Sequence, residues 1–394
     1  MNVLSLFDGM SCGQQALERL GIKVDNYFAS EIDKYAIQVT MANYPNTVQL
    51  GSVVNVNGYD LPKIDLLIGG SPCQSFSFAG KRKGMSTKDE QEILTLEHYL
   101  QLKSEGFEFE GQSYLFWEYM RLLNEVKPKY FLLENVMMGE KWEKVLSKAI
   151  GVNPIMINSS LVSAQNRQRL YWTNIGMIPG GLFGHLESII EQPKDKGILL
   201  KDVLENEVDD KYFLSEKMIN GFLAHNKRHI EEKNQTGFNW KPTEGNKKAA
   251  CLRANAALCP TDNSVIVHNM MPRSSKTGKG GTGPLSRNDG KTYCLDTGTT
   301  NAIEYVKIDK KGNKKENQNK ASCFTAGGNS GGNHSDMDLF VINNNIRRLT
   351  PIECERLQTV KDGYTNYVSD TQRYKMLGNG WTVDVITHIF SYIK

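Results

Sequence analysis

The sequence predicts an α/β protein with a doubly wound, mixed and mostly parallel sheet, interrupted by a second domain of different texture. Short apolar runs alternate with helix-like stretches in the first part of the chain, and such alternation favours a parallel sheet covered by helices. Near Asp202 the alternation gives way to a region rich in Gly, Asn, Ser and Lys, and a helical pattern returns near Thr350. The looser region is therefore expected to be an insertion within one α/β domain.

The alternation can be followed element by element before the insertion. Strands are expected at the apolar runs 3–7, 26–30, 64–68 and 130–133. Helices are expected at 14–20, 34–43 and 114–126, the last of which stops before Lys127 and Pro128. In sheets of this kind ligands bind outside the carboxyl ends of the strands, so the residues that follow these runs are the candidates for a site.

Three segments follow from these patterns. Residues 1–200 should form the main α/β domain, residues 201–345 an inserted, mostly β domain, and residues 346–394 a segment that completes the first domain. A weak repeat occurs in the insertion, and each copy contains a cysteine and is followed by a polar loop. These cysteines, which are expected to be small buried hydrophobes, are Cys251, Cys294 and Cys323. In the last segment, Thr350 should cap a helix that begins at Pro351.

Composition narrows the class of protein. The 394 residues are 39% hydrophobic, enough for a substantial core, and the net charge of +3 means that a nucleic-acid surface would need local clusters of cations. Seven dispersed cysteines favour reduced thiols, and neither a cleaved leader nor a membrane span is apparent, so a cytoplasmic protein is expected. The histidines lack metal-site spacing, so no metal is expected.

The run that ends at Gly69-Gly70-Ser71-Pro72 breaks a buried strand into a tight turn that presents Cys73. A thiolate is the reactive form of cysteine, and the cations Lys81 and Arg82 just downstream would favour it. Cys73 is therefore a candidate nucleophile. The local sequence alone is equally compatible with a structural cysteine in a turn.

Two further polar clusters stand near apolar strands. Glu134 follows Leu133 at the end of one strand and could face Cys73 across the same crevice, although a salt-bridged acid at a strand end is the commoner arrangement. Gln165, Arg167 and Arg169 alternate in an extended segment and should point to one face, where guanidinium groups could bind a carboxylate, a phosphate or a base edge. A solvated basic strand is the alternative.

Together these clusters resemble, in type and order, the motifs of the DNA cytosine-5 methyltransferase family. The matching residues are Pro72-Cys73-Gln74, Glu134-Asn135-Val136 and the Gln-x-Arg-x-Arg pattern at 165–169, with 4–13, 347–351 and 378–380 matching at the two ends. The resemblance implies a Rossmann-like, S-adenosylmethionine-dependent methyltransferase whose insertion is the target recognition domain. The stretch 87–112 looks longer than the family usually has there.

The family resemblance also implies a mechanism. A thiolate from Cys73 would add to C6 of a flipped-out cytosine in double-stranded DNA, Glu134 would bind the pyrimidine edge at N3, and Arg167 and Arg169 would hold the base and nearby backbone. The segment 79–86 would act as a lid. The residues expected to contact DNA are Gln74, Ser77, Lys81, Arg82, Gln165 and Arg273.

The cofactor implied is S-adenosyl-L-methionine. Its expected contacts are Phe7, Asp8, Gly9, Glu31, Ile32, Ser52, Leu115 and Asn379. Two departures from the family pattern affect these contacts: Ser11 and Cys12 stand where glycines are common, and Ser52 stands where an acid is expected after Gly51.

Two competing functions share some of these features. One is methylation of RNA, as in the tRNA-modifying branch of the family, against which the large insertion argues. The other is an inactive DNA-binding regulatory relative, which should have lost the nucleophile or the acid, whereas Cys73, Glu134 and Arg167 are all present. The expected partners are double-stranded DNA and, as a separately acting protein, a cognate restriction endonuclease; no membrane partner is expected, and the expected state is a monomer.

Overall fold

The structure is a computed structural model that describes most of the catalytic part of the chain and little of the insertion. The described residues are 1–72, 92–109, 111–180, 185–215, 217–221, 223–224, 247–252, 264–266, 268–270, 284–285, 301–302 and 346–394. Some of the expected site residues lie outside these ranges, namely Cys73, Gln74, Ser77, Lys81, Arg82 and Arg273. The expected lid at 79–86 lies outside them as well. The chain divides into two compact units, Met1–Gly197 with Glu355–Lys394, and Ile198–Cys354.

A seven-stranded sheet forms the centre of the first unit, in the order β3-β2-β1-β4-β5-β7-β6. Its strands are β1 (Asn2–Leu6), β2 (Asn26–Ser30), β3 (Val48–Gln49), β4 (Leu66–Gly70), β5 (Tyr130–Val136), β6 (Ile155–Asn158) and β7 (Gln168–Thr173). The neighbours from β3 to β5 are parallel, whereas β7 runs antiparallel to both β5 and β6. This is the predicted mixed, mostly parallel sheet, and its β3-β2-β1-β4-β5 part has the Rossmann order.

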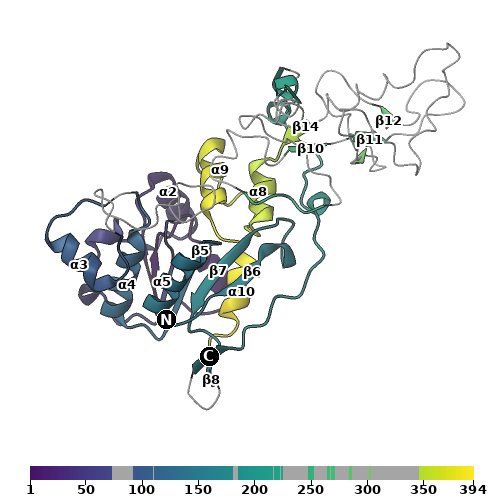
Figure 1. Cartoon of the computed structure of the whole chain (residues 1–394). Coiled ribbons are helices and arrows are strands. Elements are labelled where there is room, and N and C mark those ends of the chain that lie inside the picture. Colours follow the sequence, from purple (N-terminus) through teal and green to yellow (C-terminus); the bar gives the residue numbers. More distant parts are fainter. Residues whose placement is uncertain are drawn as a thin grey trace, which may run out of the picture. The chain divides into compact units, whose positions relative to one another are not determined.

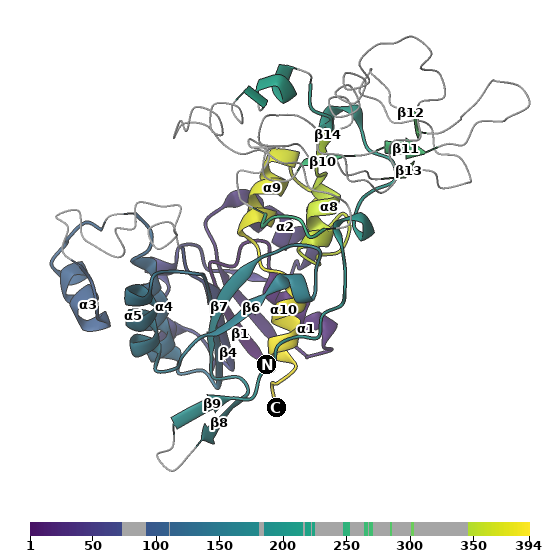
Figure 2. The ribbon, with the colours of Figure 1, turned by 45° about the vertical axis from the view of Figure 1, so that its right-hand side comes forward.

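The inner strands are apolar on both faces because helices cover both faces. Leu66, Leu67 and Ile68 of β4 are fully buried, as a central parallel strand requires. Figure 2 shows α4 (Leu115–Val126) and α5 (Glu140–Ile150) on one side of the sheet and α1 (Cys12–Arg19) and α10 (Val383–Phe390) on the other. The doubly wound prediction is thereby confirmed.

The C-terminal segment completes this unit. Two of its helices are α9 (Asp370–Asn379) and α10, and the two ends of the chain lie close together in Figure 1. An ion pair between Arg19 of α1 and Asp384 of α10 joins the first helix to the last. No helix was expected at α9, because it is polar along much of its length and lacks a regular apolar stripe.

The unusually long stretch before α4 contains α3 (Leu96–Ser104), which is joined to α4 through a buried carboxylate. Glu118 of α4 is fully buried and accepts hydrogen bonds from Tyr99 at 2.5 Å and Lys103 at 2.5 Å, both on α3. Arg121 donates to the other oxygen of Glu118 at 2.7 Å. Because removal of any partner would leave a buried charge less compensated, this network fixes α3 against α4.

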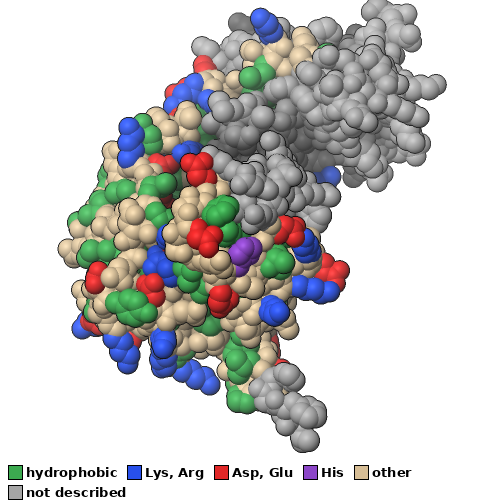
Figure 3. Space-filling model, turned by 60° about the vertical axis from the view of Figure 1, so that its left-hand side comes forward, with side chains coloured by type: hydrophobic (Ala, Val, Ile, Leu, Met, Phe, Trp, Pro, Cys, Tyr) green, Lys and Arg blue, Asp and Glu red, His purple; other side chains and the backbone are tan. Residues whose placement is uncertain are grey.

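The described surface of the molecule carries both signs of charge. On the face drawn in Figure 3, basic and acidic side chains are interspersed.

The hairpin of β8 (Met177–Gly180) and β9 (His185–Ser188) forms a separate two-stranded sheet. Within the described ranges, no helix is long and apolar enough to cross a membrane.

The regular structure described in the second unit is mostly short strands. β10 (Ser264–Ile266) pairs with β14 (Ile346–Arg348), and β11 (His268–Met270) pairs with β12 (Pro284–Leu285) and β13 (Asn301–Ala302), all antiparallel. These short antiparallel pairs agree with an inserted, mostly β domain.

The start of α8 (Pro351–Leu357) has the cap that the sequence predicted. Oγ1 of Thr350 accepts a hydrogen bond from the backbone N–H of Glu353 at 3.2 Å, and Oε2 of Glu353 accepts from the N–H of Thr350 at 2.8 Å. This is a reciprocal capping box. Glu353 also pairs with the buried Arg347 at 2.6 Å, so the cap and the strand before it are held together.

Candidate active site

The site lies where the parallel strands of the central sheet end. Leu6 at the end of β1 pairs in register with Ser30 of β2 and Gly69 of β4, and Gly70 of β4 pairs with Glu134 of β5. Parallel strands end at the same edge, so the loops that follow these four strands meet there. Five of the expected cofactor residues stand in two of those loops: Phe7, Asp8 and Gly9 follow β1, and Glu31 and Ile32 follow β2.

The loop after β1 is strained and is held by one carboxylate. Phe7 and Ser11 have positive φ angles of 57° and 60°, an unusual conformation for side chains of their size that is often found at functional sites. Oε2 of Glu31 accepts from the N–H of Gly9 at 2.8 Å, and Oε1 accepts from Ile32 at 2.7 Å and Asp33 at 2.8 Å. A carboxylate has roughly four acceptor positions, so about one remains for a ligand.

Replacing Glu31 by Gln should weaken cofactor binding about tenfold, because an amide has a single acceptor oxygen and cannot accept from all three N–H groups that order the loop. Isothermal titration with S-adenosylmethionine measures this change. The matched control is Glu97→Gln on the exposed side of α3, which should bind the cofactor as the wild type does. Equal affinities of all three proteins would contradict the role given to Glu31.

Asp8 is the least compensated acid of this loop. Its Oδ1 accepts from the hydroxyl of Tyr27 at 2.8 Å, whereas its shielded Oδ2 has no hydrogen-bond partner among the described residues. Burial raises the pKa of Asp8 from 3.8 to about 6, an effect that hydrogen bonds from Ser5, Tyr27 and Ser11 oppose and the nearby charge of Glu31 reinforces.

Asp8 should make the stability of the ligand-free protein depend on pH. Between pH 3.8 and about 6 the folded state binds more protons at this carboxyl group than the unfolded state does, so stability falls as pH rises through that window. The loss amounts to about 3 kcal/mol above pH 6. Urea unfolding of wild type and Asp8→Asn over this range measures it: the difference between the two proteins should change by that amount, and a constant difference would contradict the assignment.

The other expected cofactor residues stand after β2, after β3 and at the ends of two helices. Ile32, after β2, is 71% exposed, so its side chain is accessible to a ligand. The loop that carries Ser52 is tied to β2 by a hydrogen bond from Oγ of Ser30 to the carbonyl oxygen of Gly51 at 2.8 Å. Leu115 begins α4 and packs against the core, and Asn379 ends α9 with its side chain exposed.

The strand that leads to Cys73 is anchored just before that residue. Asn135, which is 1% exposed, donates through Nδ2 to Oγ of Ser71 at 3.0 Å, and its own Oδ1 accepts from the N–H of Val136 at 2.8 Å. The structure describes Ser71 and Pro72, and Cys73 is the next residue. The Asn135 amide therefore fixes the backbone from which the candidate nucleophile emerges.

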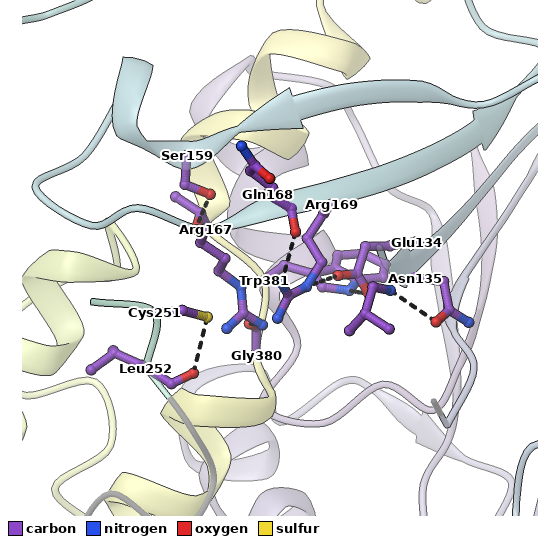
Figure 4. Close-up of polar contacts among 12 residues, drawn as sticks. Glu134, Asn135, Ser159, Arg167, Gln168, Arg169, Cys251, Leu252, Gly380 and Trp381 are labelled. Carbon is purple, nitrogen blue, oxygen red and sulfur yellow. Dashed lines mark hydrogen bonds and ion pairs between the residues drawn. The ribbon is translucent and has the colours of Figure 1, made fainter. Parts of the chain in front are cut away.

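Glu134 is held by one donor on each of its oxygens (Figure 4). Nε of Arg169 lies 2.9 Å from Oε1, and the indole Nε1 of Trp381 donates to Oε2 at 3.2 Å. Glu134 is 8% exposed, and a carboxylate in such a place is costly without partners. The predicted strand-end acid is thus both salt-bridged and located at the candidate site.

The two arginines of the Gln-x-Arg-x-Arg segment have different partners: Arg169 pairs with Glu134, and Arg167 binds a backbone turn. Figure 4 shows the guanidinium groups of Arg167 and Arg169 beside Gly380 and Trp381. Arg167 is buried and donates to the carbonyl oxygens of Gly378 at 3.2 Å and Gly380 at 3.0 Å, so it holds the turn that contains Asn379.

The DNA contact expected of Gln165 requires a correction. Gln165 is fully buried, and its Nε2 donates to the carbonyl oxygen of Leu357 at 2.7 Å and to Oε1 of Gln358 at 2.8 Å. In this structure Gln165 packs inside the protein and presents no surface to DNA.

Two residues that sequence reasoning missed complete the site. Gln358 donates to the carbonyl oxygens of Leu377 at 2.6 Å and Gly380 at 3.2 Å, and Trp381 contacts Glu134 as described above. Nothing in the local sequence marks Gln358. Trp381 could have been suspected, because an aromatic residue directly follows the turn 378–380 that matches a family motif.

Comparison with known proteins identifies the class of enzyme. The family model described as C-5 cytosine-specific DNA methylase matches residues 1–394. The chain therefore belongs to this family and is a DNA cytosine-5 methyltransferase.

The sequences of individual relatives align with nearly the whole chain. The orphan methyltransferase M.SPRI of Bacillus phage SPR is 28% identical, with 99% of this chain and 96% of the relative covered. The type II methyltransferase M.HgiCI of Herpetosiphon aurantiacus is 26% identical, with 96% and 93% covered. The solved structure of the Entamoeba histolytica methyltransferase EhMeth shares the fold, with a TM-score of 0.58 at 14% identity over 100% of this chain and 97% of that one.

Proposed function

We propose that this enzyme transfers a methyl group from S-adenosyl-L-methionine to C5 of a flipped-out cytosine in a specific double-stranded DNA sequence, through a covalent bond between Cys73 and C6. The observation that carries the proposal is the position of Glu134. It is fixed by Arg169 at the sheet edge, in register with the strand end from which Pro72 and Cys73 follow.

The reaction follows from the chemistry of these side chains. C5 of cytosine is a weak nucleophile, and addition of the Cys73 thiolate to C6 makes the C5–C6 unit enamine-like. A proton delivered or shared by Glu134 at N3 stabilises that adduct. C5 takes the methyl group as the bond from that group to the sulfonium sulfur breaks. A base then removes the C5 proton, the thiolate is eliminated from C6, and the proton shared at N3 returns to Glu134, which restores the aromatic ring and free Cys73.

The first loop fits S-adenosylmethionine on chemical grounds. When bound, this cofactor supplies an electrophilic methyl group on a positively charged sulfur. Glu31 retains an acceptor position suited to ribose hydroxyls, and the exposed Ile32 offers an apolar surface for the adenine ring. Phe7, Gly9, Ser52, Leu115 and Asn379 would complete the contacts.

DNA binding is assigned to the basic and polar residues around the nucleophile and in the insertion. A stacked cytosine hides C5 and C6 from a side chain, so the base must leave the helix before reaction. We assign residues 201–345 to recognition of the target sequence, with Arg273 at a DNA contact, and Gln74, Ser77, Lys81 and Arg82 to contacts near the flipped base. The enzyme would act as a monomer, because one flipped base per event needs no two-fold symmetry.

The relatives include orphan phage methyltransferases and type II methyltransferases. We extend the proposal to a cognate restriction endonuclease that acts separately. Its cleavage of plasmid DNA should be blocked by prior treatment with this enzyme.

The proposal is tested by incubating the purified protein with S-adenosylmethionine carrying a tritiated methyl group and either duplex DNA or total tRNA. Label should enter DNA as 5-methyldeoxycytidine, identified after digestion to nucleosides. Label that appears in RNA alone would replace the DNA proposal with RNA methylation, and no transfer to either substrate despite cofactor binding would support an inactive binding protein.

A further inference from the structure

Trp381 links two parts of the site that are far apart in the sequence. Its indole Nε1 donates to Oε2 of Glu134 at 3.2 Å, while Oε1 is engaged by Arg169. The carboxyl group is therefore held at both ends by groups that only donate. Each oxygen keeps roughly one unused position, so one oxygen can accept from the N4 amino group of cytosine, while the other, when protonated, can donate to N3.

The backbone of Trp381 is fixed independently of Glu134. The thiol of Cys12 lies 3.6 Å from the carbonyl oxygen of Trp381, and Arg167 donates to the carbonyl oxygen of the preceding Gly380 at 3.0 Å. A Cβ atom added to Gly380 would lie 2.7 Å from Cε of Met10, so this turn packs directly on the first loop. Cys12, which stands where family members commonly have glycine, thus has a specific contact here.

The strand beneath the indole also leaves room for it. Gly70 is the last residue of β4, and a Cβ atom there would lie 2.9 Å from Nε1 of Trp381 and 3.2 Å from Oε2 of Glu134. The absence of a side chain at Gly70 allows the indole to reach the carboxylate. Four segments, around Cys12, Gly70, Arg167 and Gly380, therefore converge on one hydrogen bond.

We propose that Trp381 is a positioning residue, which together with Arg169 orients the carboxyl group of Glu134 toward the pyrimidine edge. The inference rests on the proposed function, because it gives Trp381 a purpose only if Glu134 meets a cytosine. Its effect should fall on the chemical step rather than on cofactor binding.

The test compares Trp381→Phe, which keeps a ring over Gly70 but lacks the N–H, with the wild type. The substrate is a duplex with 5-fluorocytosine at the methylated position, where fluorine cannot leave as a proton would and the protein–DNA adduct persists. We expect adduct formation to slow about tenfold, the value of one hydrogen bond to a charged group. The melting temperature and the affinity for S-adenosylmethionine should be unchanged.

Trp172→Phe is the matched control. It also removes an indole hydrogen bond, from Nε1 to Oγ of Ser147 at 2.9 Å, but at a buried position in β7. This variant should lose stability and keep the wild-type rate of adduct formation. Gly70→Ala provides a second route, because it displaces the indole without removing its donor, and should slow the reaction as Trp381→Phe does.

A double-mutant cycle separates positioning from packing. In a Glu134→Ala background, Trp381→Phe should cause no further loss of adduct formation, since its effect passes through the absent carboxyl group. An equal loss in both backgrounds, an unchanged rate in Trp381→Phe, or a parallel loss of cofactor affinity would overturn the inference. A wild-type protein that forms no adduct would instead refute the proposed function itself.

Discussion

Replacing Cys73 by alanine is expected to abolish methyl transfer to DNA. The proposed reaction passes through a bond between the thiolate sulfur and C6, and alanine cannot form it, so no alternative route of comparable rate exists. Single-turnover assays with tritiated S-adenosylmethionine should detect no transfer by Cys73→Ala. Its affinity for the cofactor should equal that of the wild type, because the expected cofactor residues lie in other loops.

The matched control for this prediction is Cys354→Ala. Cys354 is a buried cysteine in α8, outside the proposed recognition region and far along the sequence from the expected nucleophile. It should retain full activity. Transfer by Cys73→Ala at a rate near that of the wild type would eliminate the covalent mechanism.

Glu134→Gln is expected to lower kcat by about 10²–10⁴, the usual contribution of a general acid. Glutamine keeps the shape of the side chain but cannot deliver a proton to N3, and it leaves Arg169 without its ionic partner at 2.9 Å. The cofactor affinity should not change, which separates this residue from Glu31. Fixed-time assays at a saturating DNA concentration measure the change in kcat.

Glu140→Gln is the matched control for Glu134→Gln. Glu140 is an exposed acid on α5 that pairs with Lys144 at 2.5 Å, and exposed pairs of this kind contribute little. It should leave kcat unchanged. A similar small loss of kcat in both variants would show that Glu134 takes no part in the chemical step.

Sequence patterns predicted four strands of the sheet, β1, β2, β4 and β5, because each contains a run of apolar residues. Leu66–Ile68 lies between two parallel neighbours and under helices on both faces, so nearly every position must be apolar and the run is easily recognised. The polar helix α9 left no comparable pattern. Its buried residues are held by contacts with distant segments, such as the ion pair of Arg373 with Glu355 at 3.1 Å.

The site was predictable where a motif follows a strand directly. Glu134, at the end of β5, and the first loop, after β1, were expected from their neighbours in the sequence. Gln165 was misjudged because its partners, Leu357 and Gln358, are nearly two hundred residues away and only folding brings them together. Trp381 escaped notice for the same reason, since its contact with Glu134 spans 247 positions.

The most direct test of the central claim is bisulfite sequencing of plasmid DNA from cells that express the wild-type chain or Cys73→Ala. We predict protected cytosines at one recurring short sequence with the wild type and none with the variant. DNA free of 5-methylcytosine in both cultures, from cells that contain folded protein able to bind S-adenosylmethionine, would contradict the account.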